Sequence, residues 1–371
     1  MRLDQAANPM FAYHQTFHPR FGWLKKGFDA AVLDPGVFLA DDATVRLGVG
    51  KNMVSAIRFW TTAFHVLDKY TLPDNARATY SGPTPLGCAL LDEQFGLDPY
   101  SEDLATLWIL HWHLVSSVSD VPVWWSTFNS FTALEFSEEQ LFEFVCDEVN
   151  ASSWTAPNVS SIEKDVDCLL HMYAPRTARA RQGIDDLLDS PFRELRLIVE
   201  SPGKSGNVRF NRGPKPGLSA EIVVYTCLDF MSRNEPDART ATVTHLTTDP
   251  GTPGRLLKLS EEVIHSAMVD VSARIQGISV TSPAGAPQLA IEEDPKTLAA
   301  MLLVSHYSRR NPGVILPKLV AGEQARLLVS PDDSQTSHGK KSRGASSGKS
   351  GQSLRTQRTS AGTTRKKRAK A

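Results

Sequence analysis

Two short helical segments on either side of a three-residue glycine turn constrain the fold of this chain more than any other feature. The turn is Gly48-Val49-Gly50, and apolar residues recur at near-helical spacing on both sides of it within residues 42–60. A helix-turn-helix needs such a tight turn, because one of its residues adopts a left-handed conformation that glycine tolerates best. Val49 is the apolar residue expected to close the small core between the two helices. The stretch therefore predicts a helix-turn-helix unit of winged-helix style.

The second helix of this unit is predicted to carry a polar face. Lys51 and Asn52 stand at its N-terminal end, with Ser55 and Arg58 further along. In DNA-binding units of this kind, the N-terminal residues of the second helix reach base edges in the major groove. Asparagine can pair with adenine and lysine with guanine, whereas Arg58 is better placed for a phosphate. We expect DNA to contact these four residues; the alternative is a winged-helix fold used for protein contacts.

A phosphate-binding loop is a competing interpretation of the same glycines. That motif requires a glycine five residues before the Gly50-Lys51 pair and a serine or threonine directly after it. Val45 and Asn52 occupy those two positions. An ATPase of this class is therefore not expected.

Basic and aromatic residues alternate just upstream, within residues 17–27. Arg20, Lys25 and Lys26 could contact nucleic acid there, because guanidinium groups and rings can meet phosphates and base faces. The alternative is that the aromatic residues anchor the core and the two lysines are merely solvated.

The charge of the chain is divided between two regions. Residues 332–371 contain eleven lysines and arginines and two acids, a net charge of +9, which leaves −10 for the rest of the chain. This tail is rich in serine, threonine and glycine and cannot bury enough apolar surface to fold, so residues 331–371 are predicted to be disordered. Its cations would attract phosphates without sequence preference. The alternative is a solubilising extension.

Most of the remaining chain has helical patterns, so the predicted fold class is mainly α, with small β wings. The region from Glu102 to Val115 is too apolar to be exposed on any face, and it predicts a buried helix. Ser137 and Gln140 form a candidate capping box. Helical patterns continue over residues 160–173 and 184–188.

Glycine and proline clusters at residues 81–83, 202–217 and 282–287 mark the expected joints. The resulting segments are an N-terminal helix-turn-helix domain (1–80), a helical domain (81–200), a second winged-helix-like domain (214–285), a helical extension (286–330) and the tail (331–371).

The second winged-helix candidate spans residues 217–273. A helical pattern over residues 218–231 is followed by a short entry segment, a proline-glycine turn and another helix start at Ser260-Glu261-Glu262. Because the segment contains few basic residues, we expect a structural or partner-binding role for it.

Catalytic signals are weak. Asp98, Glu102 and Asp103 lie in a turn that opens the buried helix, where a carboxylate cluster could hold Mg²⁺ or Mn²⁺ for phosphodiester cleavage. They also fit the positive end of a helix as plain N-terminal acids, and that explanation suffices. His111 and His113 are two residues apart and would point to different faces of a helix, so no shared metal site is expected from them.

Cysteine usage and hydropathy indicate the compartment. Four cysteines show no metal-ligand or redox spacing and are expected to be small buried side chains in a reducing cytoplasm. They are Cys88, Cys146, Cys168 and Cys227. No run of apolar residues is long enough for a membrane span, and residues 1–9 have no apolar signal core. We therefore expect a cytoplasmic protein with no membrane partner.

Several strings resemble one family taken together. They are FHPRFGWLKKG, LGVGKNMVSAIRFW, GLDPYSEDLATLWILHW and DSPFRELRLI. The chain resembles the SspB-type family of DNA phosphorothioation-associated proteins, an uncharacterised-domain family of the Ssp modification and anti-phage system, from about residue 14 to about residue 278. The resemblance implies a DNA nickase that works with a cysteine desulfurase, an ATPase and a sulfurtransferase-like enzyme. It identifies no catalytic residue. The alternative function is a non-catalytic DNA-binding adaptor or transcriptional regulator that recruits modification enzymes.

Overall fold

The computed structural model describes residues 1–116, 118–175, 190–202, 206–213 and 215–310. All of them belong to one compact unit, Met1–Ser330. The predictions of a helix over 184–188, of the end of the helical extension (311–330) and of the tail (331–371) lie outside the described residues. The described part is mainly helical with three small antiparallel sheets, so the helical body with small β elements is confirmed.

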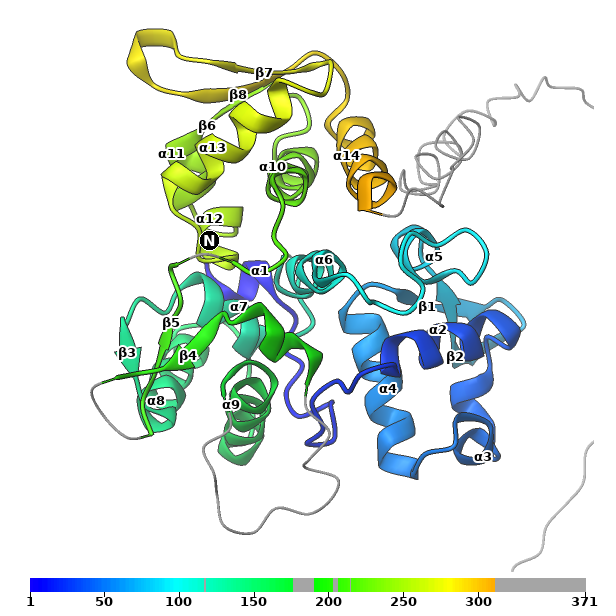
Figure 1. The fold of residues 1–371 in the computed structure, drawn as a ribbon. Helices are drawn as coiled ribbons and strands as arrows, with labels where there is room; N and C mark the ends of the chain where they lie inside the picture. Colours follow the sequence, from blue (N-terminus) through cyan, green and yellow to red (C-terminus); the bar gives the residue numbers. More distant parts are fainter. Residues whose placement is uncertain (117, 176–189, 203–205, 214, 311–371) are drawn as a thin grey trace, which may run out of the picture. The chain divides into compact units, whose positions relative to one another are not determined.

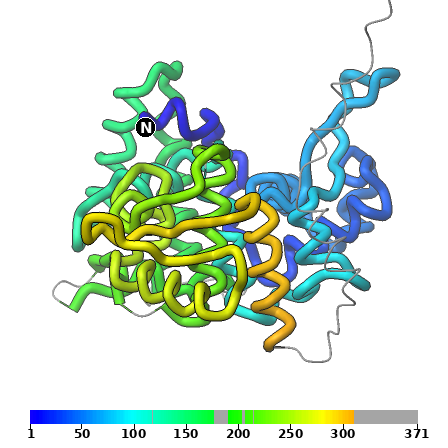
Figure 2. Tube along the Cα trace, turned by 90° about the horizontal axis from the view of Figure 1, so that it is seen from above, coloured from blue at the N-terminus to red at the C-terminus, as the bar shows by residue number. Residues whose placement is uncertain are grey.

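The N-terminal region is a group of helices followed by a hairpin (Figure 1). Its helical elements are α1 (Leu3–Ala6), α2 (Trp23–Leu33), the 3₁₀ turn η1 (Val37–Leu39), α3 (Ala43–Leu47) and α4 (Lys51–Ala63). Strands β1 (Leu67–Leu72) and β2 (Asn75–Pro83) then pair antiparallel, with Tyr70 opposite Tyr80. In Figure 2 this light-blue hairpin projects from the helices.

The turn between α3 and α4 contains a glycine in the left-handed conformation, as the sequence predicts. Gly48 ends α3 in the left-handed region at φ 62°, and its N–H donates to Thr44 and Val45 carbonyls. Val49 packs partly buried against a small cluster of Ala43, Leu47 and Val54. The two helices predicted around Gly48-Val49-Gly50 are therefore present, and a local apolar core sets the angle between them.

A close backbone approach joins the hairpin to α5 (Pro85–Leu91). A Cβ atom added to Gly87 would lie 2.1 Å from the carbonyl oxygen of Val66, a backbone atom that cannot rotate away. Thr84 Oγ1 accepts a hydrogen bond from the N–H of Gly87 at 2.9 Å and donates to the His65 carbonyl at 2.5 Å. Only glycine fits at position 87 while these contacts persist.

We expect Gly87→Ala to lower the free energy of unfolding by about 1–3 kcal/mol, as overpacking usually does, because the backbone around Val66 must shift. Urea denaturation measures this change. Gly50→Ala is the control, since nothing lies within 4 Å of an added Cβ there and the φ of −66° suits any residue. Equal stabilities of Gly87→Ala and the parent protein would contradict the close approach.

The central region consists of helices around a second sheet. Its helical elements are α6 (Leu104–Val115), α7 (Pro122–Asn129), α8 (Glu138–Asn150), α9 (Val159–Tyr173) and the 3₁₀ turn η3 (Pro191–Leu195). The sheet has the order β3 (Glu135–Phe136), β5 (Val208–Phe210), β4 (Ile198–Glu200). The predicted capping box is present, because Gln140 N–H donates to Ser137 Oγ at 3.2 Å and Ser137 N–H donates to Gln140 Oε1 at 2.9 Å.

The C-terminal region repeats a helix-and-hairpin pattern. Its helical elements are α10 (Ala220–Asn234), α11 (Val243–Thr248), α12 (Pro253–Leu256), α13 (Glu261–Ser272), the 3₁₀ turn η4 (Pro283–Gly285) and α14 (Pro295–Arg310). Its strands are β6 (Thr240–Thr242), β7 (Ile278–Thr281) and β8 (Gln288–Ile291), in the order β6-β8-β7. Helix α10 packs against α13 and α14 (Figure 1).

Helix α6 is buried on every face, as predicted, and its polar side chains bond to other regions. His113 Nε2 lies 2.6 Å from Tyr225 Oη, and Trp112 Nε1 donates to Asp229 Oδ2 at 2.6 Å. His111 Nδ1 lies 2.7 Å from Tyr173 Oη. The contacts of His113 and Trp112 cross the joint predicted at residues 202–217, and the division of the chain at that joint stays a prediction.

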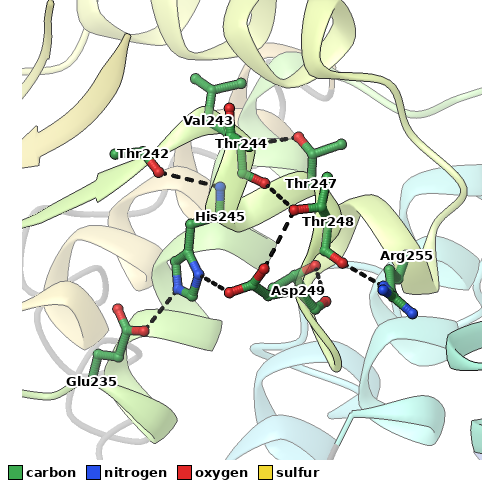
Figure 3. Close-up of polar contacts among 10 residues, drawn as sticks. Glu235, Thr242, Val243, Thr244, His245, Thr247, Thr248, Asp249 and Arg255 are labelled. Atoms are coloured by element: carbon green, nitrogen blue, oxygen red, sulfur yellow. Dashed lines mark hydrogen bonds and ion pairs between the residues drawn. The ribbon is translucent and has the colours of Figure 1, made fainter. Parts of the chain in front are cut away.

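A histidine network orders the end of α11 (Figure 3). His245 lies between two carboxylates, with Nδ1 2.7 Å from Asp249 and Nε2 2.8 Å from Glu235. Burial opposes its charge, but the two carboxylates outweigh burial and raise the pKa of His245. The network fixes the turn from α11 into α12, which carries Arg255.

The cysteines and the hydropathy of the helices can be compared with the sequence. All four cysteines are free thiols; Cys168 and Cys227 are buried, and Cys88 and Cys146 are half-buried. Within the described ranges, no helix is both long and apolar enough to cross a bilayer.

Candidate nucleic-acid interface

The N-terminal end of α4 presents an exposed polar face. Lys51, Asn52 and Ser55 are exposed there, while Val54 and Ile57 face the core. The first turn of α4 contains no acid, so the positive end of the helix dipole adds to the charge of Lys51. This face, defined by Lys51, Asn52 and Ser55, can accept phosphates and offer donors and acceptors to base edges.

Arg58 is placed differently from the other three residues. Its guanidinium Nη2 donates to the Thr79 carbonyl of β2 at 2.6 Å, and the side chain is half-buried. Burial lowers the pKa of Arg58 below its ordinary value. In this position the side chain connects α4 to the hairpin, and the phosphate contact expected of Arg58 stays a prediction.

The three upstream cations also contact the body of the protein. Lys25 Nζ lies 2.7 Å from both Asp29 and Glu93, and although burial opposes its charge, these carboxylates raise its pKa. Lys26 Nζ donates to the Leu47 carbonyl at 3.0 Å, at the end of α3. The Arg20 guanidinium lies over the rings of two aromatic residues, Phe17 at 5.6 Å and Trp23 at 5.4 Å. Lys26 therefore lies beside the turn that precedes α4, whereas Lys25 and Arg20 contact residues outside that turn.

The hairpin supplies cations that the sequence analysis did not single out. Lys69 on β1 and Arg77 on β2 are exposed. Arg58 holds β2 against α4, so the hairpin and the exposed face of α4 belong to one packed unit. Alternation of polar and apolar residues over 67–83 was the available signal, but it is interrupted on β1, where Tyr70 and Thr71 are both exposed.

Two of the three carboxylates proposed for a metal, Asp98 and Asp103, accept hydrogen bonds from backbone N–H groups at the start of α6. Asp98 is 9% exposed, and its Oδ1 accepts from the Glu102 N–H at 2.9 Å. Its Oδ2 accepts from the Asp103 N–H at 3.0 Å and from Thr106 Oγ1 at 2.5 Å. Asp103 caps α6 by accepting from the Ala105 N–H at 2.9 Å. Glu102 is exposed. These contacts match the alternative interpretation of plain N-terminal acids.

These residues do not fit a divalent cation. A magnesium site needs carboxylate oxygens that are open to the ion, and both oxygens of Asp98 already accept hydrogen bonds. No group of three or more histidine, cysteine, aspartate or glutamate side chains suited to a metal occurs in the ranges that the structure describes. His111 and His113 contact different partners, Tyr173 and Tyr225.

Comparisons with known proteins found a family and two solved structures. The family model described as "Protein of unknown function (DUF4007)" matches residues 11–307. Two crystal structures of SspB, one of them magnesium ion-bound, are each 37% identical with a TM-score of 0.78. The similarity covers 88% of this chain in both cases, with 98% of the magnesium-bound SspB chain and 99% of the other. A comparison with curated proteins gave no match.

Proposed function

Because this chain belongs to the DUF4007 family and is an SspB-type protein, we propose that it binds DNA within a DNA phosphorothioation and anti-phage defence system. The observation that carries this proposal is the exposed face of α4, in which Lys51 and Asn52 stand at the end of a helix that follows a tight turn. In helix-turn-helix proteins this end of the second helix contacts base edges.

The N-terminal region acts as a winged helix in this proposal. Helices α2, α3 and α4 are followed directly by the β1–β2 hairpin, which is the order of elements that such a unit needs. Helix α4 would enter the major groove, and the exposed Lys69 and Arg77 of the hairpin would contact phosphates.

The C-terminal region is a second winged helix with another role. Its elements α10, β6, α11, α13, β7 and β8 follow the same order, with the additional strand β6 and the additional short helix α12 between α11 and α13. Helix α13 begins with the exposed acids Glu261 and Glu262, which would repel phosphates. We therefore assign this unit to structure or to contacts with other proteins of the system, which the family resemblance gives as a cysteine desulfurase, an ATPase and a sulfurtransferase-like enzyme.

Nicking of DNA is the activity that the family resemblance suggests. The alternative, a DNA-binding adaptor or regulator without catalysis, is favoured by the engagement of Asp98 and Asp103 in hydrogen bonds at the start of α6. The magnesium ion-bound SspB structure is the reason to include this cation in an assay.

Incubation of supercoiled plasmid with the purified protein, with and without Mg²⁺ or Mn²⁺, decides between the two functions. A nickase converts the plasmid to open circles. We expect Glu102→Ala to leave that conversion unchanged, because Glu102 is exposed and lies beside carboxylates that are already hydrogen-bonded. Loss of nicking in Glu102→Ala would instead place the reaction at this turn. Binding without open circles would establish the adaptor.

A further inference from the structure

A cavity distant in sequence from α4 collects positive charge. It has a volume of about 380 Å³ and lies among the end of α7, the segment after β5, and the α11–α12 turn. Its lining includes Asn129, Phe131, Arg212, Thr248, Arg255 and Lys258. Every described residue of the lining is neutral or basic. Residues 1–331 carry a net negative charge, yet three cations and no carboxylate line this cavity.

Lys258 is enclosed by a carbonyl and an aromatic ring beside the cavity. Its ammonium donates to the Phe128 carbonyl at 2.6 Å and lies 4.1 Å from the centre of the Phe210 ring. Burial, followed by the charges of Arg212 and Arg255, lowers the pKa of Lys258 to about 7. A bound anion would stabilise the charged form of this lysine.

Arg255 is held in a fixed orientation by backbone oxygens. Its Nε donates to the Thr248 carbonyl at 2.5 Å and its Nη1 to the Asn129 carbonyl at 3.0 Å. Thr248 ends α11, where the network around His245 and Asp249 orders the chain (Figure 3). Preorganisation of this kind reduces the entropy lost when a ligand binds.

Arg212, unlike Arg255, is an exposed side chain that a ligand can reach from solvent. The side chain is exposed at the cavity, and no described carboxylate pairs with it. A guanidinium can donate two parallel hydrogen bonds to a phosphate, which a lysine cannot. The three cations come from two segments, Arg212 after β5 and Arg255 and Lys258 in and just after α12, so the charge of the cavity arises from the fold.

We propose that this cavity binds a phosphate monoester of nucleotide size, either the terminal phosphate of a DNA strand or that of a free nucleotide. A phosphate monoester near neutral pH carries about two negative charges and three acceptor oxygens, which suit two guanidinium groups and one ammonium. The volume of the cavity lies in the range of small-molecule sites, and Phe131 offers an apolar surface for the attached group. The site is separate from the face of α4 and does not rest on the function proposed above.

Isothermal titration of the full-length protein with deoxyadenosine 5′-monophosphate tests the proposal. We expect one saturable site per chain, and an affinity at least about ten-fold weaker in Arg212→Ala, the usual loss for a charge-assisted hydrogen bond. Arg209→Ala is the matched control, because Arg209 is exposed on β5 but does not line the cavity. No saturable binding, or equal losses in the two variants, would overturn the proposal.

Short single strands with and without a 5′-phosphate distinguish the two sources of the ligand. Tighter binding of the phosphorylated strand than of both the unphosphorylated strand and the nucleotide would identify a strand end. Tightest binding of the nucleotide would identify a free nucleotide. Lys51→Ala should bind the nucleotide like the parent protein, because Lys51 does not line the cavity. Loss of nucleotide binding in Lys51→Ala would contradict the assignment to this cavity, whatever the outcome of the plasmid assay.

Discussion

Replacement of both Lys51 and Asn52 by alanine is expected to weaken binding to duplex DNA by about two orders of magnitude, since each side chain that reaches a base edge contributes roughly 1–3 kcal/mol. Both side chains are exposed and project from the first turn of α4, so the variant should remain folded. Fluorescence anisotropy of a labelled duplex at one fixed salt concentration measures the loss.

The best control for this variant is the equivalent pair of residues in the C-terminal region, at the start of α13. Glu261 and Glu262 are the first two residues of α13, as Lys51 and Asn52 are of α4, and they are likewise exposed. Their replacement by alanine should leave DNA binding unchanged or slightly stronger, because it removes two negative charges. If the two double variants bind DNA equally well, the face of α4 is not the interface.

The single variants separate the two kinds of contact. Loss of Lys51 should reduce the dependence of affinity on salt by about one ion if the lysine contacts a phosphate, since each neutralised phosphate releases a counterion. Loss of Asn52 should instead relax the preference for one base and leave the salt dependence unchanged.

The features that could be predicted from sequence are those that depend on neighbouring residues. The turn at Gly48 requires a left-handed residue between two short apolar patterns, and the cap at Ser137 needs only its partner three residues later. The burial of α6 follows from its composition alone. Each of these features is determined within a few residues.

The roles of single charged side chains could not be predicted in the same way. The hydrogen bond from Arg58 to Thr79 joins α4 to a strand whose pairing the sequence does not specify. Lys25 meets Glu93, which is far along the chain. The cavity around Arg212, Arg255 and Lys258 likewise depends on the packing of separate segments. Such contacts are determined by tertiary structure, and no local pattern reports them.

Acid should destabilise this protein at a pH where most carboxylates are still ionised. His111 and His113 are buried on α6; burial lowers the pKa of His111 to about 3, and burial together with Arg233 lowers the pKa of His113 well below its ordinary value. The folded protein therefore keeps both imidazoles neutral, whereas the unfolded chain binds protons near the ordinary pKa of about 6.5. As pH falls below that value, the unfolded state binds protons at these two positions that the folded state does not bind, and stability decreases. Burial, followed by the charge of Arg233, also lowers the pKa of His65, which therefore adds to the loss.

The expected loss approaches about 1.4 kcal/mol per pH unit for each histidine, or roughly 3 kcal/mol for the pair, between about pH 6 and pH 5. His171 and His245 act in the opposite direction, because their pKa values are raised. Their stabilisation is complete at low pH and is lost only as pH rises above about 6.5.

Urea denaturation between about pH 6 and pH 5 measures the slope of stability against pH. In His111→Gln the slope should fall by about 1.4 kcal/mol per pH unit, the contribution of one proton, even if the variant is less stable at every pH. A stability that does not change from about pH 6 to pH 5 would mean that these imidazoles are protonated in the folded protein, contrary to their burial and to the bond that Arg233 donates to His113 Nδ1.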